Sequence, residues 1–379
     1  MNWRYFFGWF GVVLLIFVET AGMACLAVAL RYNRARMEAV MAPKQQEAAP
    51  LAVEPDTISL VAGGDAMMHM PQLYPAMQAD GAYNFDECFR YIAPLLEGYD
   101  LRVVNLETTL PGKNYSGYPC FGAPDAFLYG LQDAGFGTIL MANNHCCDKG
   151  SYGIRRTLSV LDSLGLEHVG LYADSAEYRD KYPLMVECKG VRIAMLNFTY
   201  GTNGLPVPKG CVVCGIDTTQ ILEGIFRARE KDADIILAFP HWGEEYFRTP
   251  RASQRELAEW LLAHGVDHII GSHPHVIEPV EVVEDSLSGG KHVVAYSLGN
   301  FISSQLQPER STSLLVGLKW VKDEKGVRFV EHQAIQTWVS RPQISGHRQA
   351  RIYPMNYPED SLNAAERTFR EACIEAGTF

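Results

Sequence analysis

Five short apolar runs that each end abruptly in polar side chains restrict the fold of this sequence more than any other feature. The clearest run is Ile139 to Ala142, which is followed by two amides, an imidazole, two thiols and a carboxylate at residues 143–148. The other four runs end in Gly64-Asp65, Asn105-Leu106-Glu107, His241-Trp242-Gly243-Glu244 and Gly271-Ser272-His273-Pro274-His275. Buried strands that carry polar side chains at their carboxyl ends are typical of α/β proteins, which keep their sites at that edge.

Strand and helix patterns alternate through most of the chain. Strands are predicted at 57–62, 101–106, 136–142, 191–198, 234–239 and 267–271, and helices at 86–96, 126–134, 152–164, 218–229 and 254–264. After this point strand patterns predominate, at 276–283, 292–296, 314–320 and 327–336, before a final helix at 360–376. This order predicts an α/β fold in which two sheets pack face to face with helices outside.

The polar strand ends carry the side chains from which metal centres are built. The candidate ligands are Asp65, His69, Glu107, Asn144, His241, His273 and His275. Carboxylate oxygen combined with imidazole nitrogen suits manganese, iron or zinc better than calcium. His273 and His275 are two residues apart, and in an extended backbone both imidazoles project to the same side. The sequence therefore predicts a divalent-cation site.

Each of these residues also has a purely structural interpretation. Asp65 follows two glycines and can cap a helix, whereas His241 can be a packed core histidine. Asp148 either orients the His145 imidazole or caps the helix expected from residue 152. The metal site is favoured because all five runs end in ligand types at equivalent positions.

Six motifs resemble those of one protein family. They are Gly64-Asp65, Asn105-Leu106-Glu107, Asn143-Asn144-His145-x-x-Asp148-x-Gly150, His241-Trp242-Gly243-x-Glu245, Gly271-x-His273-Pro274-His275-Val276 and Tyr296-Ser297-Leu298-Gly299-Asn300-Phe301. In type and order they resemble the CapA/PgsA family of bacterial capsule and poly-γ-glutamate synthesis proteins, over roughly residues 59–304. The resemblance implies a four-layer αββα sandwich of the calcineurin-like metallophosphoesterase type, two divalent metal ions and metal-dependent hydrolysis of phosphoesters.

The resemblance also implies a role for each site residue. Asp65, Glu107, Asn144, His241, His273 and His275 correspond to metal ligands, and Met67 stands where phosphoesterases commonly carry a histidine, so that His69 is the candidate to replace it. His145 is expected near the leaving group, with Asp148 as its partner. The substrate pocket is expected to include Asn143, Trp242, Glu245 and Asn300.

The N-terminal residues 5–30 are almost wholly apolar, interrupted only by Glu19 and Thr20. As a helix this stretch would span about 39 Å, enough for a hydrocarbon core of roughly 30 Å. A cleaved signal peptide is the alternative, but the stretch is long for one. We expect a membrane anchor at 1–36, a Pro/Ala-rich linker at 37–56, a CapA-like domain at 57–340, and an extension with a terminal helix at 341–379.

Two features of the sequence give opposite predictions for the side of the membrane on which the domain lies. Arg31, Arg34 and Arg36 follow the apolar stretch and favour a cytoplasmic domain. The family resemblance implies an extracytoplasmic one, and we adopt this expectation for a single-pass protein of the cell membrane. Other capsule or polymer synthesis subunits and an anionic polymer are the further partners that the resemblance implies.

Charge and cysteine content restrict the remaining possibilities. A net charge of −11 argues against sequence-independent binding of nucleic acid, because such binding needs a basic face. Eight cysteines follow Cys25, an even number that allows disulfides, with Cys211 and Cys214 as the favoured local pair. Two alternatives to a capsule phosphoesterase stay open: a non-catalytic polymer-binding or scaffold subunit, and a nucleotidase-like phosphatase unrelated to capsule.

Overall fold

Two β-sheets pack face to face in the computed structural model, which describes residues 57–285, 289–344 and 346–377. The first sheet has seven strands in the order β17-β14-β13-β1-β2-β3-β4. These are β17 (Arg351–Pro354), β14 (Gly326–Ser340), β13 (Thr312–Asp323), β1 (Thr57–Ala66), β2 (Leu101–Leu106), β3 (Thr138–Leu140) and β4 (Glu167–Val169). Strands β1 to β4 are parallel, and β13, β14 and β17 add antiparallel strands beyond β1.

The second sheet has six strands in the order β11-β12-β10-β9-β7-β6. They are β11 (Val280–Glu284), β12 (Lys291–Ala295), β10 (His268–Ile270), β9 (Ile235–His241), β7 (Val191–Thr199) and β6 (Leu184–Cys188). The four central strands are parallel and the two edge strands are antiparallel to their neighbours. Two small two-stranded sheets pair β5 (Leu171–Tyr172) with β8 (Val212–Val213), and β15 (Gln343–Ile344) with β16 (His347–Arg348).

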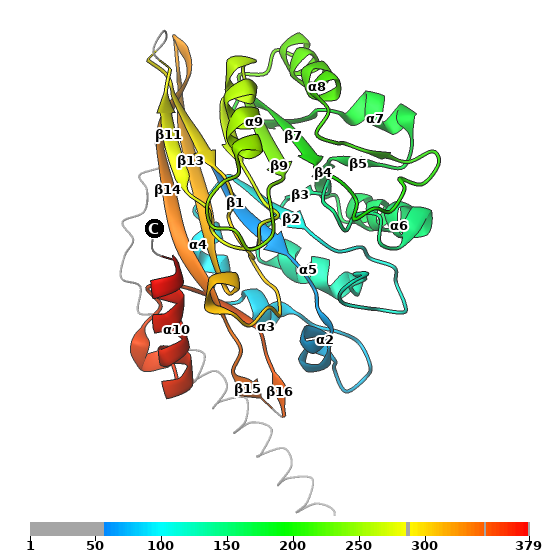
Figure 1. Ribbon diagram of the computed structural model, residues 1–379, viewed down its shortest axis with the longest axis vertical. Coiled ribbons are helices and arrows are strands. Elements are labelled where there is room, and N and C mark those ends of the chain that lie inside the picture. Colours follow the sequence, from blue (N-terminus) through cyan, green and yellow to red (C-terminus); the bar gives the residue numbers. More distant parts are fainter. Residues whose placement is uncertain (1–56, 286–288, 345, 378–379) are drawn as a thin grey trace, which may run out of the picture. The chain divides into compact units, whose positions relative to one another are not determined.

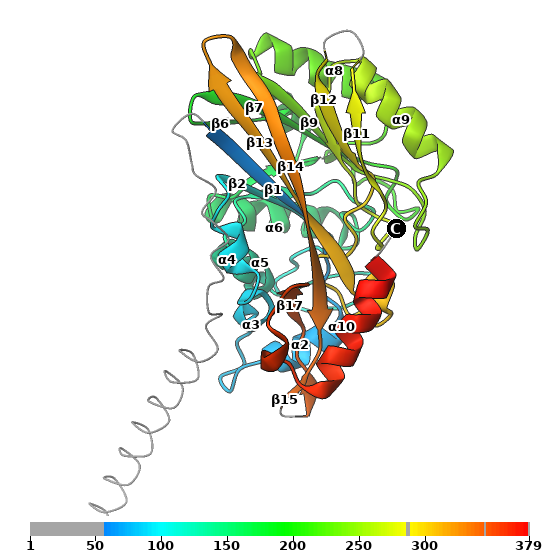
Figure 2. The ribbon, with the colours of Figure 1, turned by 90° about the vertical axis from the view of Figure 1, so that its left-hand side faces the viewer.

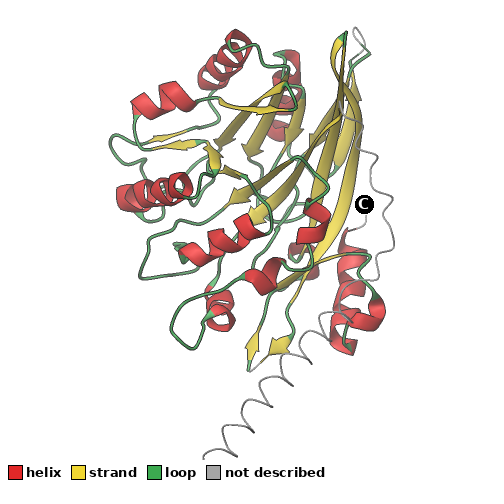
Figure 3. Ribbon diagram, turned by 180° about the vertical axis from the view of Figure 1, so that it is seen from behind, coloured by secondary structure: helices red, strands yellow, loops and turns green. Residues whose placement is uncertain are grey.

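The helices are α2 (Met70–Ala76), α3 (Asp86–Phe89), α4 (Ala93–Leu96), α5 (Asp125–Asp133), α6 (Gly150–Ser163), α7 (Ser175–Lys181), α8 (Thr218–Glu230), α9 (Ala252–Ala263) and α10 (Ala364–Gly377), with short 3-10 turns at Pro308–Arg310 and Glu359–Ser361. Helices α5 and α6 pack against the outer face of the first sheet and α8 and α9 against that of the second, whereas α10 lies beside β13 and β14 (Figures 1 and 3). Figure 2 shows the long strands β13 and β14 beside each other, with α10 at the end of β14.

Strand β1 shows how the sequence builds these layers, because alternate side chains of a strand point to opposite faces. Leu60 and Ala62 belong to the core between the sheets, together with Met195 of β7. Val61 belongs instead to the core under α5 and α6. A strand buried on both faces has to be apolar throughout, which is why the predicted strands are continuous apolar runs.

Most of the predicted elements are confirmed, and their differences have local causes. The single helix predicted at 86–96 is two short helices, α3 and α4, because Pro94 starts a new helix in its first turn. The strand predicted at 276–283 begins only at Val280, after Pro279, which has no N–H to donate to a sheet.

Several expectations concern the N-terminus or the C-terminal extension. The predicted anchor and linker, residues 1–36 and 37–56, lie outside the described residues, and no helix of the described part is both long and apolar enough to cross a membrane. In the extension, β17 pairs with β14, so that the extension supplies an edge strand to the first sheet.

Candidate metal centre

The predicted ligands meet where the carboxyl ends of strands from both sheets converge. Asp65 lies on β1 and Glu107 directly after β2, whereas His241 ends β9 in the other sheet. A register shift in the β1–β2 pairing between Gly63 and Asp65 re-aims the end of β1. Gly64 is required there, because a Cβ atom would collide with the carbonyl of Gly299, which accepts the Asp65 N–H at 3.0 Å.

One buried asparagine joins the two sheets beside this edge. Asn197 on β7 accepts the backbone N–H groups of Met141 and Ala142 at 3.0 and 2.6 Å, just after β3. Its amide donates to the Phe239 carbonyl on β9 at 2.8 Å. The two strand ends that carry Asn144 and His241 are therefore fixed relative to each other.

A first group of ligands consists of Asp65, Glu107 and His241, all fully buried, with ligand atoms within 4.8 Å of one another. Nδ1 of His241 lies 4.0 Å from Oδ1 of Asp65, and its Nε2 lies 3.9 Å from Oε1 of Glu107. Asn144 joins this group, since its Oδ1 lies 3.0 Å from Nε2 of His241.

A second group consists of Glu245, His273 and His275, again within 4.8 Å. The two groups are adjacent: His275 Nδ1 lies 3.3 Å from Asp65 Oδ2, and His275 Nε2 lies 3.8 Å from Glu107 Oε1. Glu245 was expected in the substrate pocket, and its position beside the two histidines makes it a candidate ligand as well.

The backbone of the His273-Pro274-His275 turn differs from the expectation. An extended conformation was predicted to aim both imidazoles to one side, and this is wrong, because His273 and His275 have φ angles of 102° and 60°. The rings still meet, with centroids 5.9 Å apart. Positive φ is strained for residues other than glycine and recurs at functional sites.

The polar atoms of this centre are buried without sufficient partners inside the protein. Neither carboxylate oxygen of Glu107 has a hydrogen-bond partner among the described residues, and the same holds for Nδ1 of His273 and of His275. Burial of an unpaired polar or charged group costs several kcal/mol. Two carboxylates and three imidazoles converging on one buried space fit divalent cations such as manganese, iron or zinc.

The titration behaviour of these groups agrees with a space made for positive charge. Burial and the charges of Asp65 and Glu245 raise the pKa of Glu107 well above its usual value. Burial also raises the pKa of Asp65, but its contact with His275 and the charges of His241 and His275 outweigh that effect and hold its pKa at about 2. Burial, followed by the charge of His275, lowers the pKa of His273 to about 3. A neutral imidazole is the form that binds a metal.

His145 has the position and the partners of a proton donor or acceptor at the edge of the centre. Its Nδ1 lies 2.7 Å from Oδ2 of Asp148, which also accepts the Phe121 N–H at 2.6 Å. Helix α6 has Lys149 as its N-cap and no side-chain cap, so Asp148 orients His145 and does not cap the helix. With Nδ1–H donated to Asp148, Nε2 carries the lone pair of the ring and lies 3.4 Å from the Asn203 amide nitrogen.

Asn203 is a further contact of this edge that the sequence did not reveal. Its Nδ2 lies 3.4 Å from His145 Nε2, and its Oδ1 accepts from Asn144 Nδ2 at 3.3 Å. Tyr200 covers the same side, with its ring centroid 4.5 Å from that of His273. Both residues lie in an irregular loop after β7, where no periodic pattern could have indicated them.

Four other predicted residues lie outside the ligand groups, namely His69, Asn143, Trp242 and Asn300. His69 belongs to neither group, since its Nδ1 accepts the Ser304 N–H at 3.3 Å and its ring lies against Phe121. Asn143 is used within the protein, where its amide donates to Leu106 O and Asn105 Oδ1 and its Oδ1 accepts the His145 N–H. Trp242 is buried and donates to Tyr296 O at 2.8 Å.

Asn300, the fourth of these residues, contacts the backbone of a candidate metal ligand. Its amide donates to the carbonyls of His275 and Arg310 at 3.4 and 2.9 Å, and to Gln305 Oε1 at 3.1 Å. It therefore ties the backbone of a candidate ligand to a neighbouring loop.

The cysteines take no part in the ligand groups. The eight cysteines of the described chain are free, so Cys211 and Cys214, the local pair that the sequence favoured, form no disulfide. Cys146 and Cys147 are buried thiols with their sulfur atoms 3.9 Å apart, as expected for packed side chains beside His145.

Fold and site together define an α/β protein with a buried carboxylate–histidine centre between two sheets. Residues 59–305 match the family model described as bacterial capsule synthesis protein PGA_cap, and the chain belongs to this family. The family predicted from the six motifs is thereby confirmed.

Individual relatives agree with this assignment. The chain is 27% identical over 332 residues to the capsule biosynthesis protein CapA of Bacillus anthracis, covering 84% of this chain and 75% of the relative. It is 30% identical over 276 residues to the PGA biosynthesis protein CapA of Bacillus subtilis (strain 168), covering 72% and 70%. Among solved structures, the calcineurin-like phosphoesterase YfkN of Bacillus subtilis aligns with 85% of this chain and 99% of its own, at 14% identity and a TM-score of 0.42, too distant to support an argument.

Proposed function

We propose that this protein is a metal-dependent phosphoesterase that takes part in the synthesis of a capsule polymer of the poly-γ-glutamate type. The observation that carries the proposal is Glu107, a fully buried carboxylate whose two oxygens lack hydrogen-bond partners among the described residues. A carboxylate in that position is stable only if it is protonated or bound to a cation. The imidazoles of His241 and His275, both within 4 Å of Glu107 Oε1, would supply nitrogen ligands on either side of this carboxylate.

The donor set predicts two adjacent cations. Asp65, Glu107, Asn144 and His241 would hold one, and His273, His275 and Glu245 the other, with Asp65 and Glu107 close enough to contact both. Bound cations at such a centre hold a phosphate group, lower the pKa of water and neutralise the charge of the displacement.

The chain's own contribution to the reaction centres on His145. When its imidazole is protonated, Nε2–H is directed away from Asp148 and can donate a proton to the departing oxygen of a phosphoester. Asp148 fixes the orientation of the imidazole, and the amide of Asn203 lies at the other edge of the ring. Tyr200 and His273 close one side of the space in which the phosphate would lie.

Metal analysis combined with a hydrolysis assay tests the proposal. The purified protein should contain bound manganese, iron or zinc and should hydrolyse bis(4-nitrophenyl) phosphate. His145→Ala should keep the metal and lose most of the turnover. Absence of bound transition metal would refute the metal-dependent activity. Metal binding without hydrolysis would favour the non-catalytic polymer-binding subunit instead.

The cellular setting belongs to the same proposal. Anchoring by residues 1–36, with the domain outside the cytoplasm, would place the centre where a surface polymer is assembled. Labelling of cysteine-substituted exposed positions in intact cells, with a membrane-impermeant reagent, would locate the domain. Labelling only after lysis would contradict the extracytoplasmic position.

A further inference from the structure

Arg310 lies beside the candidate metal centre with its positive charge uncompensated. Its guanidinium carbon is 3.5 Å from the ring centroid of Tyr246, whose own centroid is 6.1 Å from that of His275. Among the described residues, no carboxylate lies within ion-pair distance of the guanidinium, and Nε is buried without a hydrogen-bond partner. The arginine is half-buried, so it does not simply extend into solvent.

A second arginine in the same region provides the contrast. Arg251 stacks on the neighbouring aromatic ring, Phe247, at 3.6 Å, but its Nη2 also forms an ion pair with Glu244 at 2.6 Å. The aromatic contact positions both guanidinium groups. The Nε atoms of both arginines are buried without a hydrogen-bond partner among the described residues, so the ion pair of Arg251 is what distinguishes the two guanidinium groups.

The platform under Arg310 is fixed to the metal-binding turn. The Tyr246 N–H donates to Pro274 O at 2.7 Å, between the two candidate histidine ligands. Tyr246 also has a φ of 69°, a conformation that a bulky residue rarely adopts unless its surroundings enforce it. The position of the Tyr246 ring is therefore fixed relative to His275.

The backbone of Arg310 is held from two further sides. Asn300 donates to the carbonyls of both Arg310 and His275, as described above. Arg341 holds the chain on both sides of Arg310. It donates to the Ser303 and Gln305 carbonyls at 2.9 and 2.8 Å before Arg310, and to Ser311 Oγ at 3.0 Å directly after it. A loop fixed in this way presents its cation without having to be ordered on binding, which favours affinity.

We propose that Arg310 binds a second anionic group of the substrate, a carboxylate or phosphate on the part that does not react. The substrate class is then an anionic phosphoester with a further oxyanion next to the reacting phosphate. This inference rests on the metal centre proposed above, which would hold the reacting group. An arginine fork matches either oxyanion with two parallel hydrogen bonds.

Binding of matched phosphonates tests the inference without requiring turnover. Phenylphosphonate, 3-carboxyphenylphosphonate and 1,3-phenylenediphosphonate differ only in the second group, and calorimetry on the metal-loaded protein measures their affinities. The wild-type protein should bind at least one of the doubly anionic probes about 10- to 100-fold more tightly than phenylphosphonate, as expected for hydrogen bonds to a charged group. The stronger of the two identifies carboxylate or phosphate as the natural group.

The variants separate recognition from folding. Arg310→Ala and Arg310→Gln, the latter keeping a stem that can pack on Tyr246, should abolish the preference and leave phenylphosphonate binding unchanged. Arg251→Ala should keep the preference. Equal binding of all three probes by the wild-type protein, or a preference that survives both Arg310 substitutions, would overturn the inference. Bis(4-nitrophenyl) phosphate hydrolysis, assayed in parallel, tests the proposed activity separately, so that an inactive protein with an intact preference would refute only that activity.

Discussion

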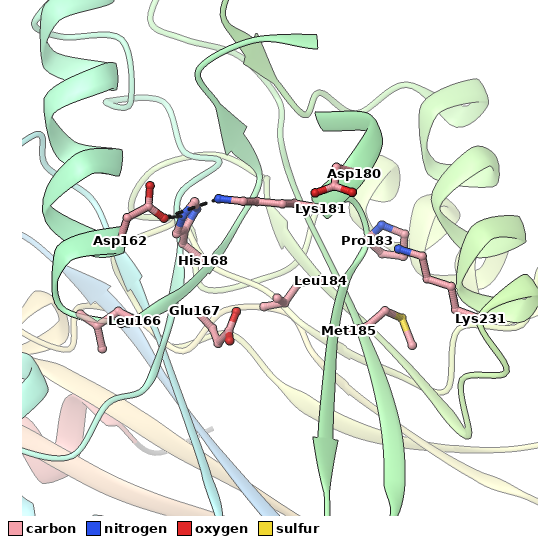
Figure 4. A pocket seen from close by; sticks show the side chains of 11 residues that line it. Asp162, Leu166, Glu167, His168, Asp180, Lys181, Pro183, Leu184, Met185 and Lys231 are labelled. Atoms are coloured by element: carbon pink, nitrogen blue, oxygen red, sulfur yellow. Dashed lines mark hydrogen bonds and ion pairs between the residues drawn. The ribbon is translucent and has the colours of Figure 1, made fainter. Parts of the chain in front are cut away.

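Two regions of this protein carry carboxylates and imidazoles at metal-binding spacing, and they differ in the burial and the pairing of their carboxylates. At the strand ends, Glu107 is fully buried and neither of its carboxylate oxygens has a hydrogen-bond partner among the described residues. On the surface, Asp162, His168 and Glu177 also have ligand atoms within 4.8 Å of one another, beside a pocket of about 390 Å³ (Figure 4).

The surface group is neutralised within the protein. Lys181 lies 2.8 Å from Glu177 and 3.5 Å from Asp162, which is also 3.2 Å from His168 Nε2. The Asp162 side chain is 54% exposed, so water satisfies its remaining lone pairs. Spacing alone therefore does not define a metal site. A buried carboxylate with no partner demands a cation, whereas an exposed carboxylate beside a lysine does not.

Glu107→Gln is the substitution with the largest expected effect on this comparison. It removes a carboxylate that lies within 4 Å of histidines of both ligand groups, and we expect metal affinity to fall by about 100-fold or more, beyond the 10- to 100-fold typical of outer-shell changes. In the metal-free protein the same change should raise the melting temperature, because no acidic group then has to be kept neutral by burial. Metal content and thermal unfolding, each with and without a chelator, measure both effects.

Glu177→Gln is the matched control in the surface group and should leave metal content unchanged. If Glu107→Gln keeps its metal while Glu177→Gln loses it, the assignment of the two regions is reversed.

His145→Ala should reduce kcat by about 100- to 10,000-fold, the usual contribution of a general acid or base. Metal content should remain, because His145 contacts Asp148 and Asn203 and belongs to neither ligand group. His168→Ala, which changes the histidine of the surface group, should leave kcat unchanged. Loss of metal together with activity would instead make His145 a ligand.

Sequence reasoning succeeded where the signal was a pattern of several residues. The strands β2, β7, β9 and β12 were predicted to within two residues, because each contains a run of apolar residues, and β7 and β9 are buried almost throughout. Very short strands such as β4 gave no such pattern. The parallel arrangement of β1 and β2 brings Asp65 and Glu107 to one edge, and the face-to-face packing of the two sheets brings His241 of β9 to the same place.

Single polar residues escaped the same reasoning. Nothing in the sequence around Asn197 or Asn203 indicates that one joins the two sheets and the other contacts His145, since both contacts depend on tertiary structure. The His273-Pro274-His275 turn was located correctly but given the wrong backbone conformation, because strain enforced by surrounding packing has no local signature. The pairing of Glu245 with these histidines depends on the same turn.

Glu278 offers an intermediate case, a buried carboxylate with one oxygen paired. Gln254 donates to its Oε2 at 2.7 Å, while Oε1 has no partner among the described residues. Burial raises its pKa from 4.5 to about 7, against the opposing effects of Gln254, Arg255 and Arg251. Between these pH values the folded protein keeps a proton that the unfolded chain has released, so stability should fall as pH rises from about 4.5 to 7.

Glu278→Gln should remove this part of the pH dependence, on the order of 2 kcal/mol in the free energy of unfolding. Urea unfolding of the metal-free protein at pH 5 and pH 7.5 measures it. The variant reports the contribution of all other titrating groups. If the difference in stability between pH 5 and pH 7.5 is the same in the wild-type protein and in the variant, Glu278 is solvated.

The smallest effect is expected for Lys181→Met in the surface group. Lys181 is 39% exposed, and exposed ion pairs contribute about 0.2–1 kcal/mol and weaken with salt. We therefore expect a loss of less than about 1 kcal/mol at low ionic strength, reduced further in molar salt. Removal of the lysine also leaves Asp162, His168 and Glu177 without their neutralising cation, which makes this variant the strictest test of the comparison. If Lys181→Met then bound zinc with the affinity of the strand-end centre, the decisive difference between the two regions would be whether the carboxylates have a cationic partner in the protein, and not how deeply they are buried. If it bound none, burial would be the decisive difference, as the cost of an unpaired Glu107 implies.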